Sequence, residues 1–134
     1  MALTILDVME RYGPLIGRIF LSVIFLKSCV GKIMNFAGTQ QFMAAAGMPM
    51  TALFLTAAIV LEFVGVASLV LGYRPRVGAW ALIVFLVPAT LIFHTNFADQ
   101  MQQGQFLKNL AMLGGLFYVA TYGSGPLSLT KSGR

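Results

Sequence analysis

Charged residues are scarce in this 134-residue sequence: 10% of its residues are charged, whereas 58% are apolar. A soluble domain usually has about a quarter of its residues charged and needs polar side chains to cover its surface. The mean hydropathy of +0.84 indicates the same imbalance. The composition therefore argues against a soluble domain and predicts an integral membrane protein.

Thiol and imidazole groups are almost absent, since Cys29 and His94 are the only residues of their types. One thiol cannot form a disulfide within a single chain, which excludes an internal thiol–disulfide cycle. One histidine can neither ligate a haem iron from both sides nor build a metal site of several histidines. The sequence supports no haem, metal or flavin, and any redox chemistry requires a partner.

Acidic residues are also few: four Asp and Glu stand against nine Lys and Arg, which makes the net charge +5. The cations are scattered and form no basic stripe with interleaved aromatic residues, so nucleic-acid binding is not expected. Their positions are more informative about topology, because short cytoplasmic loops are enriched in Lys and Arg.

The sequence contains four long apolar runs, at residues 14–34, 51–71, 77–96 and 106–123. Each approaches the ~20 residues that a helix needs to cross a bilayer. The runs are continuous rather than alternating, which favours helices over the strands of a barrel. The predicted fold class is an all-α membrane protein, a bundle of four transmembrane helices.

The connections between the runs differ in character. Residues 72–76 predict a tight turn, and hence an antiparallel hairpin of the second and third spans. Residues 35–50 carry no charge. Within them Thr39 is expected to cap a short interfacial helix that ends near Gly47. Residues 97–105 are expected to form an exposed loop.

The distribution of cations predicts the orientation in the membrane. Four spans place both termini on the same side, and that side carries most of the cations. The opposite side has only Lys32 and Lys108 near its boundary. Both termini are therefore expected in the cytoplasm. The cations on the predicted cytoplasmic side are Arg11, Arg18, Arg74, Arg76, Lys131 and Arg134.

Three cations lie in the first apolar run, where an ionised side chain costs about 2.5–3.5 kcal/mol on insertion scales. At 100° per residue, Arg18 and Lys32 differ by about 40° around the helix, whereas Lys27 lies about 180° from Arg18. Arg18 and Lys32 are therefore expected to face inward, on one stripe with Ser22 and Cys29. Lys27 is expected to face the lipid.

Glu62 is the single acid within the four predicted spans. By depth it falls between Arg18 and Lys32, roughly 7 Å from Arg18 along the membrane normal. The predicted arrangement is an Arg18–Glu62 ion pair with Lys32 nearby. Two alternatives stay open: a protonated Glu62, since burial disfavours the charged form, and a pair that serves only to fix helix packing.

A second polar group is expected at the non-cytoplasmic end of the bundle. His94 ends the third run, and the connection to the fourth run brings it level with Lys108 and Asn109. A neutral imidazole can pass a proton or hold a carbonyl oxygen, and Lys108 and Asn109 can donate hydrogen bonds. The alternatives are a Lys108 that only extends to the membrane surface and a His94 that only satisfies a neighbouring carbonyl.

Taken in order along the chain, these residues resemble the DoxX family of small bacterial inner-membrane proteins. No single motif is specific, but the ordered set covers almost all of residues 1–134 and indicates one domain. The segments that carry the resemblance are Arg18, Gly31-Lys32, Phe36-Ala37-Gly38-Thr39, Ala46-Gly47-Met48-Pro49, Leu61-Glu62, Leu71-Gly72-Tyr73-Arg74, Phe93-His94 and Phe106-Leu107-Lys108-Asn109-Leu110.

The resemblance implies a four-helix inner-membrane protein associated with membrane redox work. Relatives include subunits of a thiosulfate to quinone oxidoreductase and a membrane partner of a thiol-handling oxidative-stress complex. The expected function is a quinone-interacting module, with Glu62 or His94 relaying protons and a partner protein delivering electrons. The residues expected to bind the quinone are Arg18, Lys32, Lys108 and Asn109.

Two other functions are open. The first is a non-catalytic membrane anchor or assembly subunit, in which the buried charges fix packing and residues 35–50 dock a partner. The second is a carrier for a small solute or proton with Glu62 as its switch, which the lack of an inverted repeat disfavours. The expected partners are the lipid membrane, a redox protein and a second copy of the chain, the last because small-residue faces permit self-association.

Overall fold

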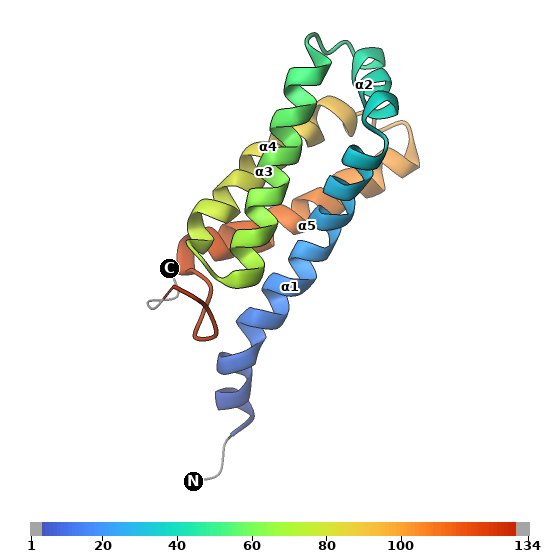
Figure 1. Cartoon of the computed structure of the whole chain (residues 1–134). Coiled ribbons are helices and arrows are strands. Elements are labelled where there is room, and N and C mark those ends of the chain that lie inside the picture. The colour runs from blue at the N-terminus through green and yellow to red at the C-terminus, as the bar shows by residue number, and fades with distance from the viewer. Residues whose placement is uncertain (1–3, 131–134) are drawn as a thin grey trace.

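The structure is a computed structural model that describes residues 4–130, and this part of the chain is helical with no strand. Four long helices run alternately up and down, and a short helix connects the first two of them (Figure 1). The predicted all-α class is confirmed. The helices are α1 (Ile5–Met34), α2 (Phe36–Ala45), α3 (Thr51–Leu71), α4 (Pro75–Phe93) and α5 (Gln100–Tyr122).

Helix α1 begins at Ile5, earlier than the predicted residue 14, and its first turns project beyond the other helices (Figure 1). The Thr4 hydroxyl accepts from the backbone N–H of Asp7, and the Asp7 carboxylate accepts from the backbone N–H of Thr4. This capping box satisfies two of the backbone N–H groups that a helix start leaves free. Pro14 lies inside the helix and does not begin it.

Helices α3 and α4 form the predicted antiparallel hairpin, which is confirmed. Gly72 has a φ of +67° at the end of α3, and Pro75 supplies the preset φ of the first turn of α4. Gly65 allows the two helices to approach closely, because a Cβ added there would lie 2.3 Å from Cγ of Leu82. Helix α3 packs against α4 on one side of this hairpin and also against α1.

Two predicted boundaries are wrong. Helix α2 begins at Phe36, so Thr39 is an interior residue, and its hydroxyl donates to the carbonyl of Asn35 instead of capping the helix. Helix α5 begins at Gln100 and takes in most of the expected loop 97–105, because the Asp99 side chain caps it by accepting from the backbone N–H of Met101. Glutamine is a good helix former, so the Gln-rich stretch continues the helix once it is capped.

Three of the described helices are long and apolar enough to cross a membrane: α1, α3 and α4. Large apolar side chains such as Phe20, Phe63 and Val84 are exposed on their outer faces, as expected for surfaces that meet lipid. Helix α5 has 23 residues, so it spans about 34 Å, but its first half is rich in polar side chains. The expected fourth span stays a prediction.

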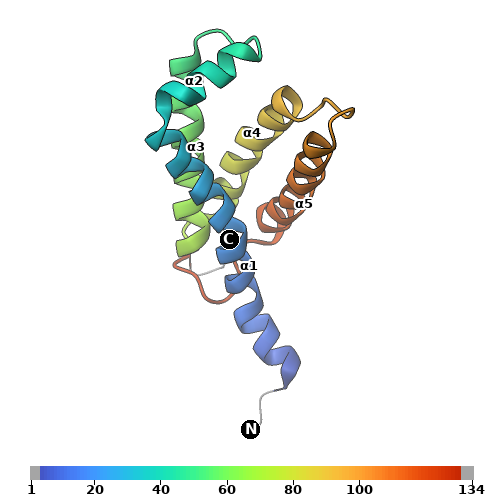
Figure 2. The same cartoon turned by 90° about the vertical axis from the view of Figure 1, so that its right-hand side faces the viewer.

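The apolar core lies along α3 and α4, with single residues from α1 and α5. Helix α4 packs against both α3 and α5. In Figure 2, α3 and α5 diverge towards the end of the molecule at which α2 lies, with α4 between them. The buried residues of this core are Phe25, Val66, Leu69, Ala79, Leu82, Ile83, Leu86 and Leu116.

Candidate functional site

The inward stripe predicted for α1 is present. Arg18, Ser22 and Cys29 are buried on this helix, and the Lys32 side chain is 19% exposed. Lys27 is exposed on the opposite side. The 3.6-residue periodicity of the helix therefore identified which cations lie inside the bundle and which one is exposed.

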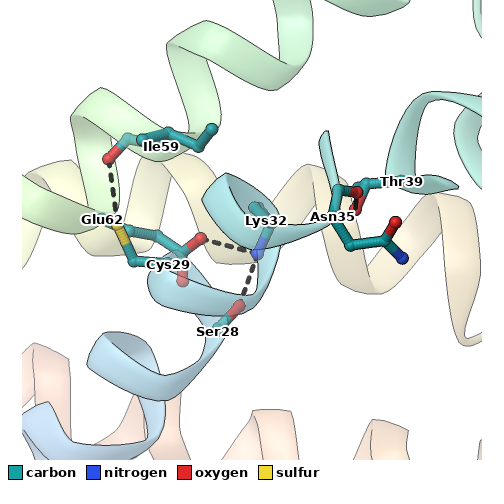
Figure 3. A network of polar contacts seen from close by, with 7 residues as sticks. All are labelled: Ser28, Cys29, Lys32, Asn35, Thr39, Ile59 and Glu62. Atoms are coloured by element: carbon teal, nitrogen blue, oxygen red, sulfur yellow. Dashed lines mark hydrogen bonds and ion pairs between the residues drawn. The ribbon is translucent and has the colours of Figure 1, made fainter. Parts of the chain in front are cut away.

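Glu62 forms its ion pair with Lys32 and not with Arg18, so the predicted partner is wrong. Lys32 Nζ lies 2.7 Å from Glu62 Oε1 and also donates to the hydroxyl of Ser28, one turn earlier on α1 (Figure 3). Glu62 is completely buried. Its second oxygen, Oε2, has no hydrogen-bond partner among residues 4–130.

Arg18 binds backbone oxygens at the other end of the bundle. Its Nη1 donates to the carbonyl of Leu69 over 2.7 Å, and its Nη2 donates to the carbonyl of Leu127. Leu69 lies seven residues beyond Glu62 on α3, roughly 10 Å along the helix axis. The guanidinium of Arg18 therefore lies too far from Glu62 to pair with it as Lys32 does. It binds a carbonyl near the C-terminal end of α3 instead.

The chain after α5 folds back over this end of the bundle. The backbone N–H groups of Leu129 and Thr130 donate to the carbonyls of Leu71 and Gly72, over 3.1 and 3.0 Å. Together with the bond from Arg18 to Leu127, these contacts tie residues 127–130 to the middle of α1 and to the end of α3. The expected cytoplasmic residues Lys131 and Arg134 lie outside the described part of the chain.

The Lys32–Glu62 pair lies on the wall of a cavity of about 900 Å³ to which all five helices contribute. Apolar side chains form most of the wall. The ring of Phe85 lies 4.9 Å from Lys32 Nζ, where its face attracts the ammonium group. Near α2, Phe42 stacks on Phe93 with ring centroids 5.1 Å apart. The polar residues on the wall include Ser28, Lys32, Glu62, His94, Lys108 and Asn109.

The structure places His94, Lys108 and Asn109 on the wall of this same cavity. His94 lies just after the end of α4, and Lys108 and Asn109 lie in α5. Asn109 is buried, and its Nδ2 donates to the hydroxyl of Thr90 over 2.9 Å. Lys108 is exposed. Nδ1 of His94 is buried and has no hydrogen-bond partner within residues 4–130.

His94 follows the last residue of α4. Burial lowers the pKa of its imidazole below the ordinary value near 6.5, and the positive charge of Lys108 lowers the pKa further. The imidazole is therefore neutral at pH 7, with one nitrogen able to donate a hydrogen bond and the other able to accept one.

Sequence reasoning assigned no role to two hydroxyl residues and one aromatic residue of the site. Ser28 lies one turn before Lys32, and Thr90 one turn before His94, so helical spacing from the charged residues carried a signal for both. Phe85 carried no signal, because its place beside Lys32 depends on how α4 packs against α1 and α3. Neither hydroxyl stands out in composition or motif.

Fold and site together define a class: a helical membrane protein with a buried ion pair on the wall of a largely apolar cavity. The DoxX family model matches residues 13–95, and the chain belongs to the DoxX family. The matched range contains Lys32, Glu62 and His94 and ends before Lys108.

Two curated relatives cover most of the chain. The inner membrane protein YqjF of Escherichia coli (strain K12) is 35% identical over 123 residues, which is 92% of this chain and 93% of that protein. The inner membrane protein YphA of the same organism is 33% identical over 122 residues, 87% of each chain. No solved structure gives a significant match.

Proposed function

We propose that this protein is an inner-membrane quinone-binding subunit of a redox system. The observation that carries the proposal is the Lys32–Glu62 pair, in which a fully buried carboxylate with one unpartnered oxygen lines an apolar cavity. Burying an ion pair in a membrane protein is costly, and intramembrane charges of this kind commonly mark a functional site.

The cavity suits a hydrophobic ring that bears oxygen atoms. Its volume of about 900 Å³ lies within the range of small-molecule sites. The aromatic residues Phe42 and Phe85 offer surfaces for a ring. Polar groups are few, and most of them occupy two places on the wall, around Glu62 and around His94. A lipid-soluble quinone combines an apolar ring with two oxygens on opposite sides of that ring.

Each polar residue has a role that its contacts permit. Lys32 Nζ holds the Glu62 carboxylate in place, and it can also donate to a ligand oxygen. Glu62 Oε2 and the neutral imidazole of His94 can each accept a proton. Asn109 is held by Thr90 and keeps the wall in shape. Arg18 is committed to two backbone carbonyls, so it is not assigned to the ligand.

A bound quinone would supply the two-electron chemistry, and a partner protein would deliver or remove the electrons. The topology proposed with this function has α5 as the fourth span and both termini in the cytoplasm. Two observations support it: α5 runs alongside α4 through the depth of the bundle, and residues 127–130 return to the end at which α1 enters.

The test is to purify the protein in mild detergent, extract bound lipids and quantify quinone by mass spectrometry. We expect a stoichiometric quinone in the wild-type protein and a large loss in the Glu62→Gln and Lys32→Met variants. Lys27→Met is the matched control, because it removes a cation from the exposed side of the same helix. A folded wild-type protein that carries no quinone, and only a co-purifying protein, would indicate a non-catalytic anchor instead.

A further inference from the structure

A second space in the molecule lies between α1 and α5. This α1–α5 groove has a volume of about 640 Å³ and is lined by residues of α1 between Pro14 and Ile24 and by residues between Lys108 and Gly123. Helix α1 packs against α2 and α3, and α5 packs against α4, but within residues 4–130 α1 and α5 do not pack extensively on each other. Phe20 and Tyr118 line the groove and are 74% and 71% exposed, so the groove is open to the outside of the bundle.

The α1–α5 groove adjoins the cavity that has the Lys32–Glu62 pair on its wall. Three residues, Ile24, Lys108 and Met112, line both spaces. From these residues the groove follows α5 to its C-terminal end, roughly 20 Å of helix. The groove therefore continues the cavity outward, between two helices that are not packed together.

The wall of the groove is mostly apolar, with side chains such as Leu21 and Val119. Arg18 also reaches the wall, but its guanidinium donates to the carbonyls of Leu69 and Leu127. The groove follows a part of α1 that is apolar enough to lie within a membrane. A long surface with few free polar groups suits a hydrocarbon chain, because a polar group would lose its hydrogen bonds there.

The chain after α5 bounds the far end of the groove. A Cβ added at Gly125 would lie 2.6 Å from Cβ of Pro14, which is itself a groove residue, so the backbone lies directly against α1 at this point. The groove is thus bounded at one end and joins the cavity at the other.

A lipid-soluble quinone has two parts, a ring with oxygen atoms and a long apolar tail. Resting on the proposed function, we infer that the ring binds in the cavity while the tail lies in the α1–α5 groove. Lys108 is exposed and lines both spaces, so its ammonium group can donate to a ring oxygen where they join.

The groove holds the tail by contact rather than by the hydrophobic effect. A tail that comes from the bilayer leaves hydrocarbon and not water, so its gain is the van der Waals contact with the walls of the groove. The ligand therefore enters sideways from the membrane, between α1 and α5. The substrate class is a tailed quinone that resides in the membrane, and not a water-soluble one.

The experiment is photo-crosslinking of the protein in nanodiscs. The probe is a benzoquinone whose decyl tail carries a diazirine at its end, and the competitor is an excess of plain decyl-tailed benzoquinone. Labelled residues are mapped by mass spectrometry. We expect labels that the competitor displaces on groove residues such as Leu21 and Val119, and none on α2 or on the outer face of α3.

A variant that fills the groove tests the same inference. Gly17 lines the groove, and a Cβ at this position has no neighbour within 4 Å, so the side chain of Gly17→Leu enters free space. We expect displaceable labelling of the groove to fall about threefold or more, because the tail loses its contacts with the wall. Gly31→Leu is the matched control on the same helix: its Cβ also has no neighbour within 4 Å, and Gly31 lines neither space. It should label as the wild type does.

The outcomes separate this inference from the proposed function, because quinone content is measured independently by extraction. If quinone is bound but the displaceable labels lie on α2 or outside the groove, the tail site is wrong and the quinone site stands. Groove labels that the competitor does not displace indicate a membrane lipid there and also overturn the inference. Neither bound quinone nor a displaceable label overturns both proposals. If Gly17→Leu does not fold, the wild-type map alone decides the question.

Discussion

Helix α1 buries two cations on one face, and the structure uses them in different ways. Arg18 donates to the carbonyls of Leu69 and Leu127, so its charge is spread over backbone oxygens at the end of α3. Lys32 holds a carboxylate that keeps one oxygen without a partner beside a cavity. The difference shows that a buried charge is not by itself a sign of function. What distinguishes the Lys32 region is that the cation pairs with a buried carboxylate on the wall of a cavity, whereas the hydrogen bonds of Arg18 go to backbone carbonyls.

The strongest test of the difference between the Lys32 and Arg18 regions is to remove one member of the Lys32–Glu62 ion pair. We expect Lys32→Met to lower the free energy of unfolding by about 3–5 kcal/mol, because it leaves Glu62 buried without its cation. The Lys32→Met, Glu62→Leu double variant should recover most of that loss, since no charge is then buried. Thermal and chemical unfolding in detergent measures both. A double variant as unstable as the sum of the single variants would contradict the pairing.

Arg18→Met tests the other region. It removes charge-assisted hydrogen bonds to two carbonyls, each with a net contribution of about 1.5 kcal/mol or more, so we expect a loss of roughly 3 kcal/mol. The effect should be concentrated in residues 127–130, which hydrogen exchange can resolve. Quinone content should stay at the wild-type level, and a fall in that content without unfolding would place Arg18 in the ligand site after all.

The packing of the hairpin can be compared with the open side of α1. Gly65→Ala would bring a Cβ within 2.3 Å of Leu82, a completely buried residue, so we expect a loss of about 1–3 kcal/mol. Gly17→Ala is the matched control, because a Cβ at that position has no neighbour within 4 Å. It should stabilise the helix by about 0.5–1 kcal/mol. Equal effects at the two positions would contradict the close approach of α3 and α4.

The smallest expected effect is the pH dependence contributed by His94, since this side chain is only partly buried. Burial, and then the charge of Lys108, lower its pKa in the folded protein below the ordinary value near 6.5. The imidazole of the folded protein therefore binds its proton at a lower pH than the imidazole of the unfolded chain. As the pH drops below about 6.5 the unfolded chain takes up the proton first, so the stability of the folded protein falls. Unfolding measured from pH 8 to pH 5 should show a shallower fall in His94→Gln. An identical slope would contradict the shift.

Much of the site was predictable because α-helical periodicity is independent of tertiary packing. The phase of α1 placed Arg18 and Lys32 inside and Lys27 outside, as the structure confirms. The axial position of Glu62 against α1 was not predictable in the same way. It depends on where each helix begins, and α1 begins at Ile5, well before the first apolar run.

The start of α5 was missed for a related reason. A Gln-rich stretch has no apolar periodicity, and its helical state depends on the cap from Asp99 and on packing against α4. The short helix α2 was expected, but its start was placed at Thr39, a residue that is compatible with a helix end and with a helix interior. Local sequence can favour a helix, but the residues at which the helix begins and ends also depend on capping and on packing against other helices.

The sequence by itself determined that this chain is helical, that it belongs in a membrane and which face of α1 carries the buried cations, because these follow from composition and from the geometry of a single helix. Only the tertiary structure decided that Glu62 pairs with Lys32, that Arg18 binds carbonyls at the far end, and that the polar groups share one cavity. The physical reason is that a side chain chooses its partner by the axial register and close packing of two helices, and neither is encoded within one helix alone.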